Sequence, residues 1–164
     1  MTVVHKVSAA VVLVILTLSL QSAGMGALIH GAIAYFERAP RRLGRLHSAV
    51  LLVRFTIAIF ILHTVQILVW AGFYRWKCFP SWESSYYFSI TSYSTVGYGD
   101  LVLPTIWRTL GSVESVTGVL TCGLSVSLLF AIVSYLVQRD ERLPSLTEPI
   151  AERESTFMHS GTTG

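Results

Sequence analysis

Three long stretches of this chain contain no Asp, Glu, Lys or Arg, and they constrain its fold more than any other feature. They cover residues 7–36, 55–74 and 115–138, which is 30, 20 and 24 residues. A helix rises about 1.5 Å per residue and the hydrocarbon core of a bilayer is about 30 Å thick, so each stretch is long enough to cross a membrane. Only 13% of all residues are charged, against roughly 25% in soluble domains. The sequence therefore predicts an all-α membrane protein with three transmembrane helices.

Basic residues between the first two stretches predict the orientation of the chain. The loop over residues 37–49 contains a single acid and four arginines, which are Arg38, Arg41, Arg42 and Arg45. Lys and Arg are enriched in cytoplasmic loops, so we expect this loop and the C-terminus inside the cell and the N-terminus outside. A basic loop can also bind nucleic acid, but its position between two membrane spans is explained by topology, and we expect no nucleic-acid partner.

The first stretch is predicted to stay in the protein as an additional N-terminal transmembrane helix within residues 1–36. The alternative is a cleaved signal peptide, which has a charged n-region, an apolar run of about 7 to 15 residues and a small-residue cleavage site. Here Lys6 is the whole charged n-region, the apolar run is much longer, and no clear Ala-x-Ala site follows it. Cleavage is therefore the weaker interpretation.

Residues 75–106 must enter and leave on one side of the membrane, because the third stretch begins where the second one exits. Within this segment the sequence "FPSWESSYYFSITSYS" predicts a short helix. Pro80 and Ser81 are typical of a helix start, and Glu83 suits the positive N-terminal end of a helix. About 13 residues make only about 20 Å of helix, which cannot cross a bilayer. We therefore predict a re-entrant helix here.

The sequence "TVGYG" at residues 95–99 follows this short helix directly and calls for irregular backbone at membrane depth. Such backbone is tolerated in a bilayer only where protein surrounds it or where it lines water. Gly97 and Gly99 reach backbone angles that strain other residues, so successive carbonyl oxygens can turn to one side while Val96 and Tyr98 pack away. Stacked carbonyl rings of this kind replace the water around a potassium ion. A dinucleotide-binding motif is excluded, because its third glycine and its βαβ context are missing.

The hexapeptide "TVGYGD" is the signature of potassium channels, and residues 50–138 resemble the prokaryotic two-helix pore module of the ion-channel superfamily. The resemblance implies an outer helix, a pore helix, a selectivity filter and an inner helix in that order. It also implies a homotetramer, because four filter loops surround the ion in this family and the chain carries one. The resemblance further implies a selectivity filter that binds K+ at its first four residues. The filter residues are Thr95, Val96, Gly97, Tyr98 and Gly99. The helix within residues 1–36 lies outside the resemblance.

Asp100 closes the hexapeptide, and the resemblance implies that it is a hydrogen-bonded clamp behind the filter. A solvated carboxylate at the pore mouth is the alternative. Some relatives carry a Glu four residues before the filter threonine as the partner of this aspartate, but this chain has Thr91 there. We therefore predict another donor to Asp100, either Tyr87 or a backbone group, and the consequence for inactivation stays open.

The third stretch is expected to line the pore below the filter. Gly118 and Gly123 stand where the family's inner helix has its bending or close-packing glycines. Gly118 is the hinge candidate, with close helix packing as the alternative. Residues spaced by four are expected to face the conduction path, with Phe130 as a hydrophobic constriction. These residues are Cys122, Val126, Phe130 and Ser134.

This helix is expected to begin near the outer surface, several residues before the uncharged stretch. Glu114 then lies about two turns inside it, where an ionisable group is costly unless it is paired or protonated. It can face the outer vestibule, or it can pack behind the short helix and support the filter. Its depth of about 10 Å matches that of Gln66, so we predict a hydrogen bond to Gln66, or else to Thr91 or Ser92. His63 is predicted to be a satisfied residue of a helix interface and not a sensor.

The remaining segments predict little chemistry. Residues 139–164 are polar and are expected to form a short, disordered cytoplasmic tail near membrane lipid. Cys78 is predicted outside the membrane, as a free thiol or in an intersubunit disulfide. We find no catalytic triad, metal-ligand cluster or phosphate-binding loop in the sequence and predict that the protein is not an enzyme.

The sequence as a whole predicts passive potassium conduction through a tetrameric, carbonyl-lined filter. The protein is expected to be a multi-pass protein of the cell membrane, and its short, domain-poor build favours a bacterial inner membrane. A weakly selective monovalent cation channel is one alternative. A non-conducting membrane subunit or scaffold is the other.

Overall fold

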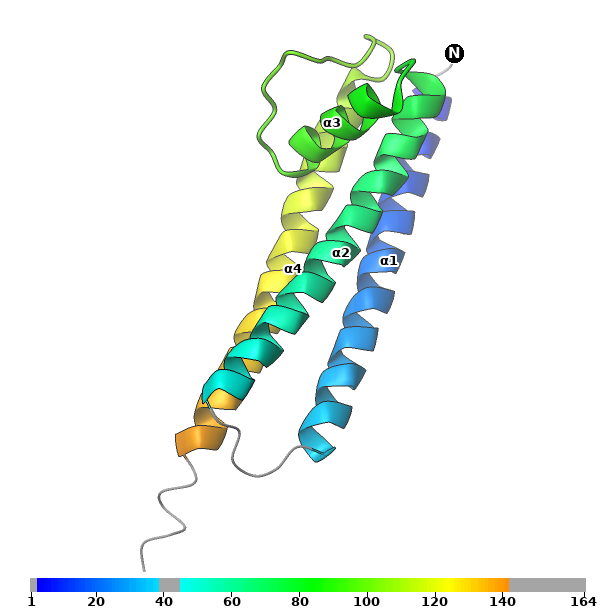
Figure 1. Cartoon of the computed structure of the whole chain (residues 1–164). Coiled ribbons are helices and arrows are strands. Elements are labelled where there is room, and N and C mark those ends of the chain that lie inside the picture. Colours follow the sequence, from blue (N-terminus) through cyan, green and yellow to red (C-terminus); the bar gives the residue numbers. More distant parts are fainter. Residues whose placement is uncertain (1–2, 39–44, 142–164) are drawn as a thin grey trace, which may run out of the picture.

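The computed structural model describes residues 3–38 and 45–141, which form four helices and their connections (Figure 1). The long helices are α1 (Val3–Arg38), α2 (Arg45–Lys77) and α4 (Arg108–Glu141), and the short helix is α3 (Trp82–Tyr93). The long helices run side by side in alternating directions, and α3 lies at the end of the bundle that also holds the N-terminus (Figure 1). All three long helices are long and apolar enough to cross a membrane. The predicted all-α fold with three transmembrane helices is confirmed.

The first two long helices extend further into the loop that connects them than the apolar stretches indicated. α1 ends at Arg38 and α2 begins at Arg45, so both helices take residues from the predicted loop over 37–49. Charged residues do not end a helix, because their long side chains can reach the membrane surface from its last turn. The centre of the predicted basic loop, residues 39–44, lies outside the described residues.

α4 is also longer than the third uncharged stretch. It begins at Arg108 and therefore includes Glu114, as the predicted depth of Glu114 required. At its other end it continues to Glu141, so the first residues of the predicted tail belong to the helix. The rest of that tail, residues 142–164, lies outside the described residues.

Two apolar clusters hold the long helices together, one near each end of the bundle. The cluster next to α3 consists of Leu13, Trp70, Tyr74, Leu103, Trp107 and Leu110. The cluster at the opposite end consists of Ala32, Leu51, Phe55 and Ile132. Much apolar surface of the single chain is nevertheless open, and Phe60 on α2 and Phe130 on α4 are each 72% exposed. Apolar exposure on this scale fits contact with lipid or with further copies of the chain rather than with water.

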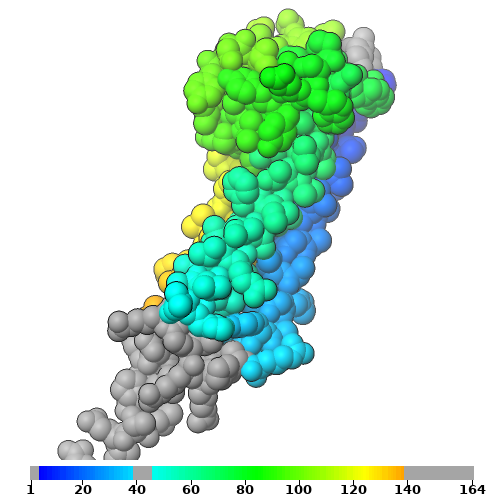
Figure 2. All heavy atoms as spheres, in the orientation of Figure 1, coloured from blue at the N-terminus to red at the C-terminus, as the bar shows by residue number. Residues whose placement is uncertain are grey.

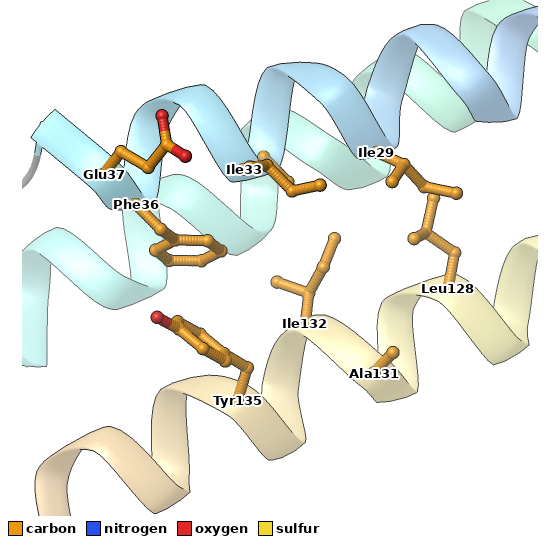
Figure 3. A pocket seen from close by; sticks show the side chains of 9 residues that line it. Ile29, Ile33, Phe36, Glu37, Leu128, Ala131, Ile132 and Tyr135 are labelled. Carbon is orange, nitrogen blue, oxygen red and sulfur yellow. The ribbon is translucent and has the colours of Figure 1, made fainter.

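The segment from the end of α2 to the start of α4 forms a broad head on the narrow bundle of long helices (Figure 2). Away from this head, an apolar groove of about 420 Å³ lies between α1 and α4. Phe36 and Tyr135 face each other there with ring centroids 4.6 Å apart, and Glu37 is the one charged lining residue (Figure 3). The groove supplies apolar surface, so the polar features that bear on function lie in and behind the head.

Candidate functional site

The short helix α3 begins and ends where its sequence predicted. The Ser81 hydroxyl oxygen caps its first turn by accepting a hydrogen bond from the backbone nitrogen of Ser84 at 3.1 Å. Glu83 lies in that first turn, at the positive end of the helix. The backbone nitrogen of Ser94, the C-cap, donates to the carbonyl of Ile90 at 3.0 Å. With 12 residues, α3 is about 18 Å long and does not span a bilayer.

After Ser94 the backbone angle φ is positive at every second residue. Thr95, Gly97 and Gly99 have φ of 62°, 51° and 81°, and they are the only described residues with positive φ. In a β-strand consecutive peptide groups point to opposite sides, whereas a reversal at every second residue turns them to the same side. Two of these positions are glycines that the sequence singled out. Thr95 was not anticipated, and a threonine in this region costs about 1–2 kcal/mol, a strain typical of functional sites.

Backbone hydrogen bonds fasten the start of this loop to the end of α3. The nitrogen of Thr95 donates to the carbonyl of Ser92 at 3.0 Å, and the nitrogen of Gly97 donates to the carbonyl of Thr91 at 3.1 Å. The Thr91 hydroxyl, in contrast, donates to the carbonyls of its own helix, with Tyr87 at 2.9 Å. Thr91 thus contacts the loop through its backbone and not through its side chain.

Asp100 is held by the side chain of Tyr87. The Tyr87 hydroxyl donates to Asp100 Oδ2 at 2.8 Å, which is one of the two kinds of donor that the sequence suggested. This hydrogen bond to the carboxylate raises the pKa of Tyr87 above its ordinary value. The pair connects α3 with the residue that follows the filter motif.

Glu114 is fully buried behind α3, but its partners differ from the predicted ones. Tyr74 of α2 donates to Oε2 at 2.8 Å, and Ser89 of α3 lies 2.5 Å from Oε1. The prediction that Glu114 forms a hydrogen bond with Gln66, Thr91 or Ser92 was wrong. Matching depths along two helices do not show which faces of those helices meet. Glu114 of α4 therefore connects to α2 and α3 through one carboxyl group.

A second set of polar contacts lies one turn further along α3, at Tyr93. The Tyr93 hydroxyl is 2.5 Å from Gln66 Oε1, 2.6 Å from Thr121 Oγ1 and 2.8 Å from His63 Nδ1. The other ring nitrogen of His63 is 2.9 Å from the hydroxyl oxygen of Ser125. His63 thus has partners on two neighbouring helices, as the sequence predicted for an interface residue.

The face of α4 that its own chain leaves open carries the predicted pore-lining residues. Cys122, Val126 and Phe130 are exposed and Ser134 is half-buried. The polar residues Thr117, Thr121 and Ser125 lie on the face that is buried within the chain. The arrangement is compatible with a pore-lining strip, which stays a prediction.

The two glycines of α4 have different surroundings. A Cβ atom at Gly118 would overlap the carbonyl oxygen of Tyr93, whereas a Cβ at Gly123 would meet nothing within 4 Å. α4 therefore approaches the end of α3 closely at Gly118. This contact favours the close-packing interpretation of Gly118, and its role as a hinge stays a prediction.

Both cysteines of the described residues are free thiols in the single chain. Cys78, just after α2, is half-buried. Burial raises the pKa of its thiol to about 11, so the thiol is protonated at neutral pH.

Comparison with known proteins adds the family to this geometry. The sequence model of the ion channel family matches residues 44–135, which is more than half of the chain, and the chain belongs to this family. The match contains α2, α3 and α4 except for its last residues and excludes α1. The protein is thus a multi-pass membrane protein from a family of ion channels rather than of enzymes.

Individual relatives are similar to parts of this chain only. This chain is 36% identical over 63 residues to the potassium voltage-gated channel subfamily A member 2 of Xenopus laevis. The aligned part covers 38% of this chain and 13% of the relative. The chain is 34% identical over 93 residues to the A-type voltage-gated potassium channel KCND3 of Homo sapiens, covering 56% of this chain and 14% of the relative. The chain thus spans only a small part of the length of the curated relatives that it matches. No solved structure matches the chain.

Proposed function

We propose that the protein conducts potassium ions passively across the membrane through a filter made by residues 95–99 of several identical chains. The observation that carries the proposal is the loop after α3, where φ is positive at Thr95, Gly97 and Gly99. Membership of the ion channel family supports it. So do the relatives in the preceding comparison, which are potassium channels by name.

The proposed ion sites are the carbonyl oxygens of Thr95, Val96, Gly97 and Tyr98, together with the Thr95 hydroxyl. Peptide oxygens that turn to one side can replace the hydration shell of a dehydrated cation without any charged ligand. The C-terminal end of α3, next to Thr95, carries a partial negative charge from the helix dipole and favours a cation nearby. Gly99 completes the filter, and Tyr87 holds Asp100 behind it.

One loop cannot surround an ion, so the proposal includes a homotetramer. Tyr98 is 72% exposed and Val96 is 52% exposed on the single chain, which leaves both side chains available for contact with neighbouring copies. The exposed strip on α4 then faces the shared axis below the filter, with Phe130 as its constriction. The head of the molecule would face outward and the loop between α1 and α2 would face the cytoplasm, as its arginines indicate.

A weakly selective cation channel is the second candidate, and one observation favours it. The clamp on Asp100 is a single hydrogen bond from Tyr87, and the Thr91 hydroxyl is engaged with its own helix. A filter held by fewer contacts at its outer end discriminates less well between ions of similar size.

Ion flux from purified protein in liposomes tests the proposal. We expect potassium flux, and reversal potentials in mixed sodium and potassium that follow the potassium gradient. Gly97→Ala places a side chain at a positive φ of 51° and is expected to abolish the flux, whereas Gly72→Ala on α2, where the added Cβ meets nothing within 4 Å, is the matched control. Equal permeability to sodium would favour the second candidate. An intact tetramer without flux over a range of pH and voltage would contradict both and favour a non-conducting subunit.

A further inference from the structure

α1 lies outside the residues matched by the ion channel family, yet one of its side chains reaches the polar contacts behind the filter. Gln21 is 1% exposed at the middle of α1. Its Nε2 donates to Ser125 Oγ at 3.0 Å and to the carbonyl oxygen of Thr121 at 3.2 Å, both on α4. Its Oε1 accepts a hydrogen bond from Gln66 Nε2 of α2 at 2.7 Å. Gln21 therefore connects α1 to both long helices of the pore module.

The carbonyl of Thr121 fixes the direction of every hydrogen bond that follows. A carbonyl only accepts, so the amide nitrogen of Gln21 must point to Thr121 and its oxygen must point to Gln66. The amide nitrogen of Gln66 then donates to Gln21, which leaves the Gln66 oxygen facing the Tyr93 hydroxyl at 2.5 Å. An amide oxygen cannot donate, so the single hydroxyl proton of Tyr93 goes to Gln66.

The same proton count assigns the tautomer of His63. Since the Tyr93 proton is already committed, the contact of 2.8 Å between Tyr93 and His63 Nδ1 requires that Nδ1 carries a proton and donates. In the neutral ring Nε2 is then an acceptor, and the Ser125 hydroxyl at 2.9 Å donates to it. Ser125 in turn accepts from Gln21, and the sequence of donors returns to its start.

These contacts form a closed ring in which each side chain donates to the next, and we call it the polar ring. Its members in order of donation are Gln21, Ser125, His63, Tyr93 and Gln66. They come from all four helices. The ring satisfies its members without a net charge, and among the described residues Arg75 Nε is the only buried side-chain nitrogen or oxygen without a hydrogen-bond partner.

We propose that Gln21 is a positioning residue: by closing the polar ring, α1 fixes Tyr93 at the end of the pore helix and thereby stabilises the conducting form of the filter. Tyr93 stands two residues before Thr95, whose strained backbone is hydrogen-bonded to the last turn of α3. Strained conformations persist only where their surroundings determine them fully. This inference rests on the proposed channel function, and it gives α1 a role in that function.

Thr17 provides a matched control on the same helix. It is fully buried, and its hydroxyl oxygen accepts a hydrogen bond from Trp70 Nε1 at 2.9 Å. Thr17→Val removes a polar contact between α1 and α2 with little change of shape, and it does not touch the polar ring. Gln21→Leu removes the ring's link through α1 and leaves Gln66 without its acceptor. Both variants weaken the attachment of α1, but only Gln21→Leu opens the ring.

The functional test compares inactivation of the potassium current in these variants, with tetramer assembly measured in parallel. Gln21→Leu removes three hydrogen bonds, and one side-chain hydrogen bond changes an equilibrium within a membrane about 3- to 20-fold. We therefore expect the ratio of conducting to inactivated channels to fall at least about 3-fold. Thr17→Val is expected to leave the ratio unchanged. Ser125→Ala opens the ring by a smaller change and is expected to act in the same direction as Gln21→Leu. Equal ratios in Gln21→Leu and Thr17→Val would overturn the positioning role.

A structural readout separates the failure of this inference from a failure of the channel proposal. Nitrogen NMR of labelled protein in lipid, with the His63 signals identified by their loss in His63→Asn, reports the tautomer whether or not the protein conducts. We expect a neutral ring with the proton on Nδ1 in the unaltered protein, and loss of this preference in Gln21→Leu. A proton on Nε2 in the unaltered protein would overturn the ring even if potassium flux is observed. Absence of flux with the Nδ1 tautomer present would instead contradict the proposed function and retain the ring.

Discussion

The charge state of Glu114 can be derived by counting the protons around it. The Ser89 hydroxyl has one proton but lies 2.9 Å from the carbonyl of Ile67 and 2.5 Å from Glu114 Oε1. One proton cannot serve both contacts with good geometry, so we predict that Glu114 carries a proton and donates it to Ser89, which then donates to Ile67. Tyr74 supplies the donor for the other carboxyl oxygen. A neutral acid therefore satisfies every group, and it also avoids the cost of a charge at this depth.

Glu114→Gln and Glu114→Ala separate this neutral acid from a carboxylate. An amide keeps both contacts of the neutral acid, because its oxygen accepts from Tyr74 and its nitrogen donates to Ser89, and it adds one further N–H. We therefore expect a loss in the free energy of unfolding of about 1 kcal/mol, the low end of the cost of one unpaired buried donor. Glu114→Ala leaves the buried Tyr74 hydroxyl without an acceptor, at about 1–3 kcal/mol, and also creates a cavity. Truncation of buried side chains of comparable length costs about 2–5 kcal/mol. The expected loss for Glu114→Ala is therefore about 3 kcal/mol or more per chain.

Unfolding of the purified protein in detergent micelles, followed by tryptophan fluorescence, measures these differences. Trp70 and Trp107 pack in the apolar cluster that contains Tyr74, so they report on this region. Tyr74→Phe is an intermediate case, because it removes one donor with almost no change of shape and should cost about 0.6–1.7 kcal/mol. If Glu114→Gln lowers the stability as much as Glu114→Ala, Glu114 is a carboxylate and the proton count is wrong. A loss below about 1 kcal/mol in Glu114→Ala would show that the buried contacts contribute little.

Three further predictions concern the filter, the packing of α3 and the head. Tyr87→Phe removes the exposed hydrogen bond to Asp100, so we expect faster decay of the potassium current with little change in the stability of the fold. An unchanged decay rate would exclude the clamp. Gly118→Ala is expected to reduce tetramer yield on size-exclusion chromatography, because the added methyl group overlaps the end of α3, whereas Gly123→Ala meets open space; equal yields would contradict the close approach. The thiolate is the reactive form of cysteine, and the pKa of Cys78 is raised to about 11. In a chain without the second cysteine, alkylation of Cys78 should therefore be slow at neutral pH and should accelerate as the pH rises toward that value, and a rate at neutral pH equal to that of a free cysteine would refute this.

Features that depend on neighbouring residues in the sequence were predictable. The three transmembrane helices follow from the length of uncharged stretches alone. The start of α3 follows from Ser81 and Glu83, because capping acts within one turn of the backbone. The donor from Tyr87 to Asp100 was among the predicted possibilities, since both residues flank the same loop.

Features that depend on the rotation of a helix about its axis were not predictable. In a soluble protein an apolar stripe shows which face of a helix is buried. In a membrane both the lipid-facing side and the packed side are apolar, so this signal is missing. For this reason the partners of Glu114 were predicted wrongly and the role of Gln21 went unnoticed. The sequence did contain one sign of the role of Gln21, because a glutamine in the middle of an uncharged stretch indicates a polar contact between helices. The positive φ of Thr95 was missed because glycines alone were used as the sign of unusual backbone.

The buried polar residues explain how helices that are apolar on all sides pack with defined rotations about their axes. Apolar surfaces bind each other in lipid with little preference, so specific hydrogen bonds and close packing select the helix rotations. Here they do so at two heights along α3, through Ser89 and Tyr93, which are four residues apart and therefore lie on one face of that helix. The face of α3 toward its own chain is thus held at two points, one at Glu114 and one at the polar ring. The loop that begins at Thr95 is fastened to the end of α3, and its residues 95–100 are exposed. Under the proposed function, this exposed side is the one that would face the other copies of the chain.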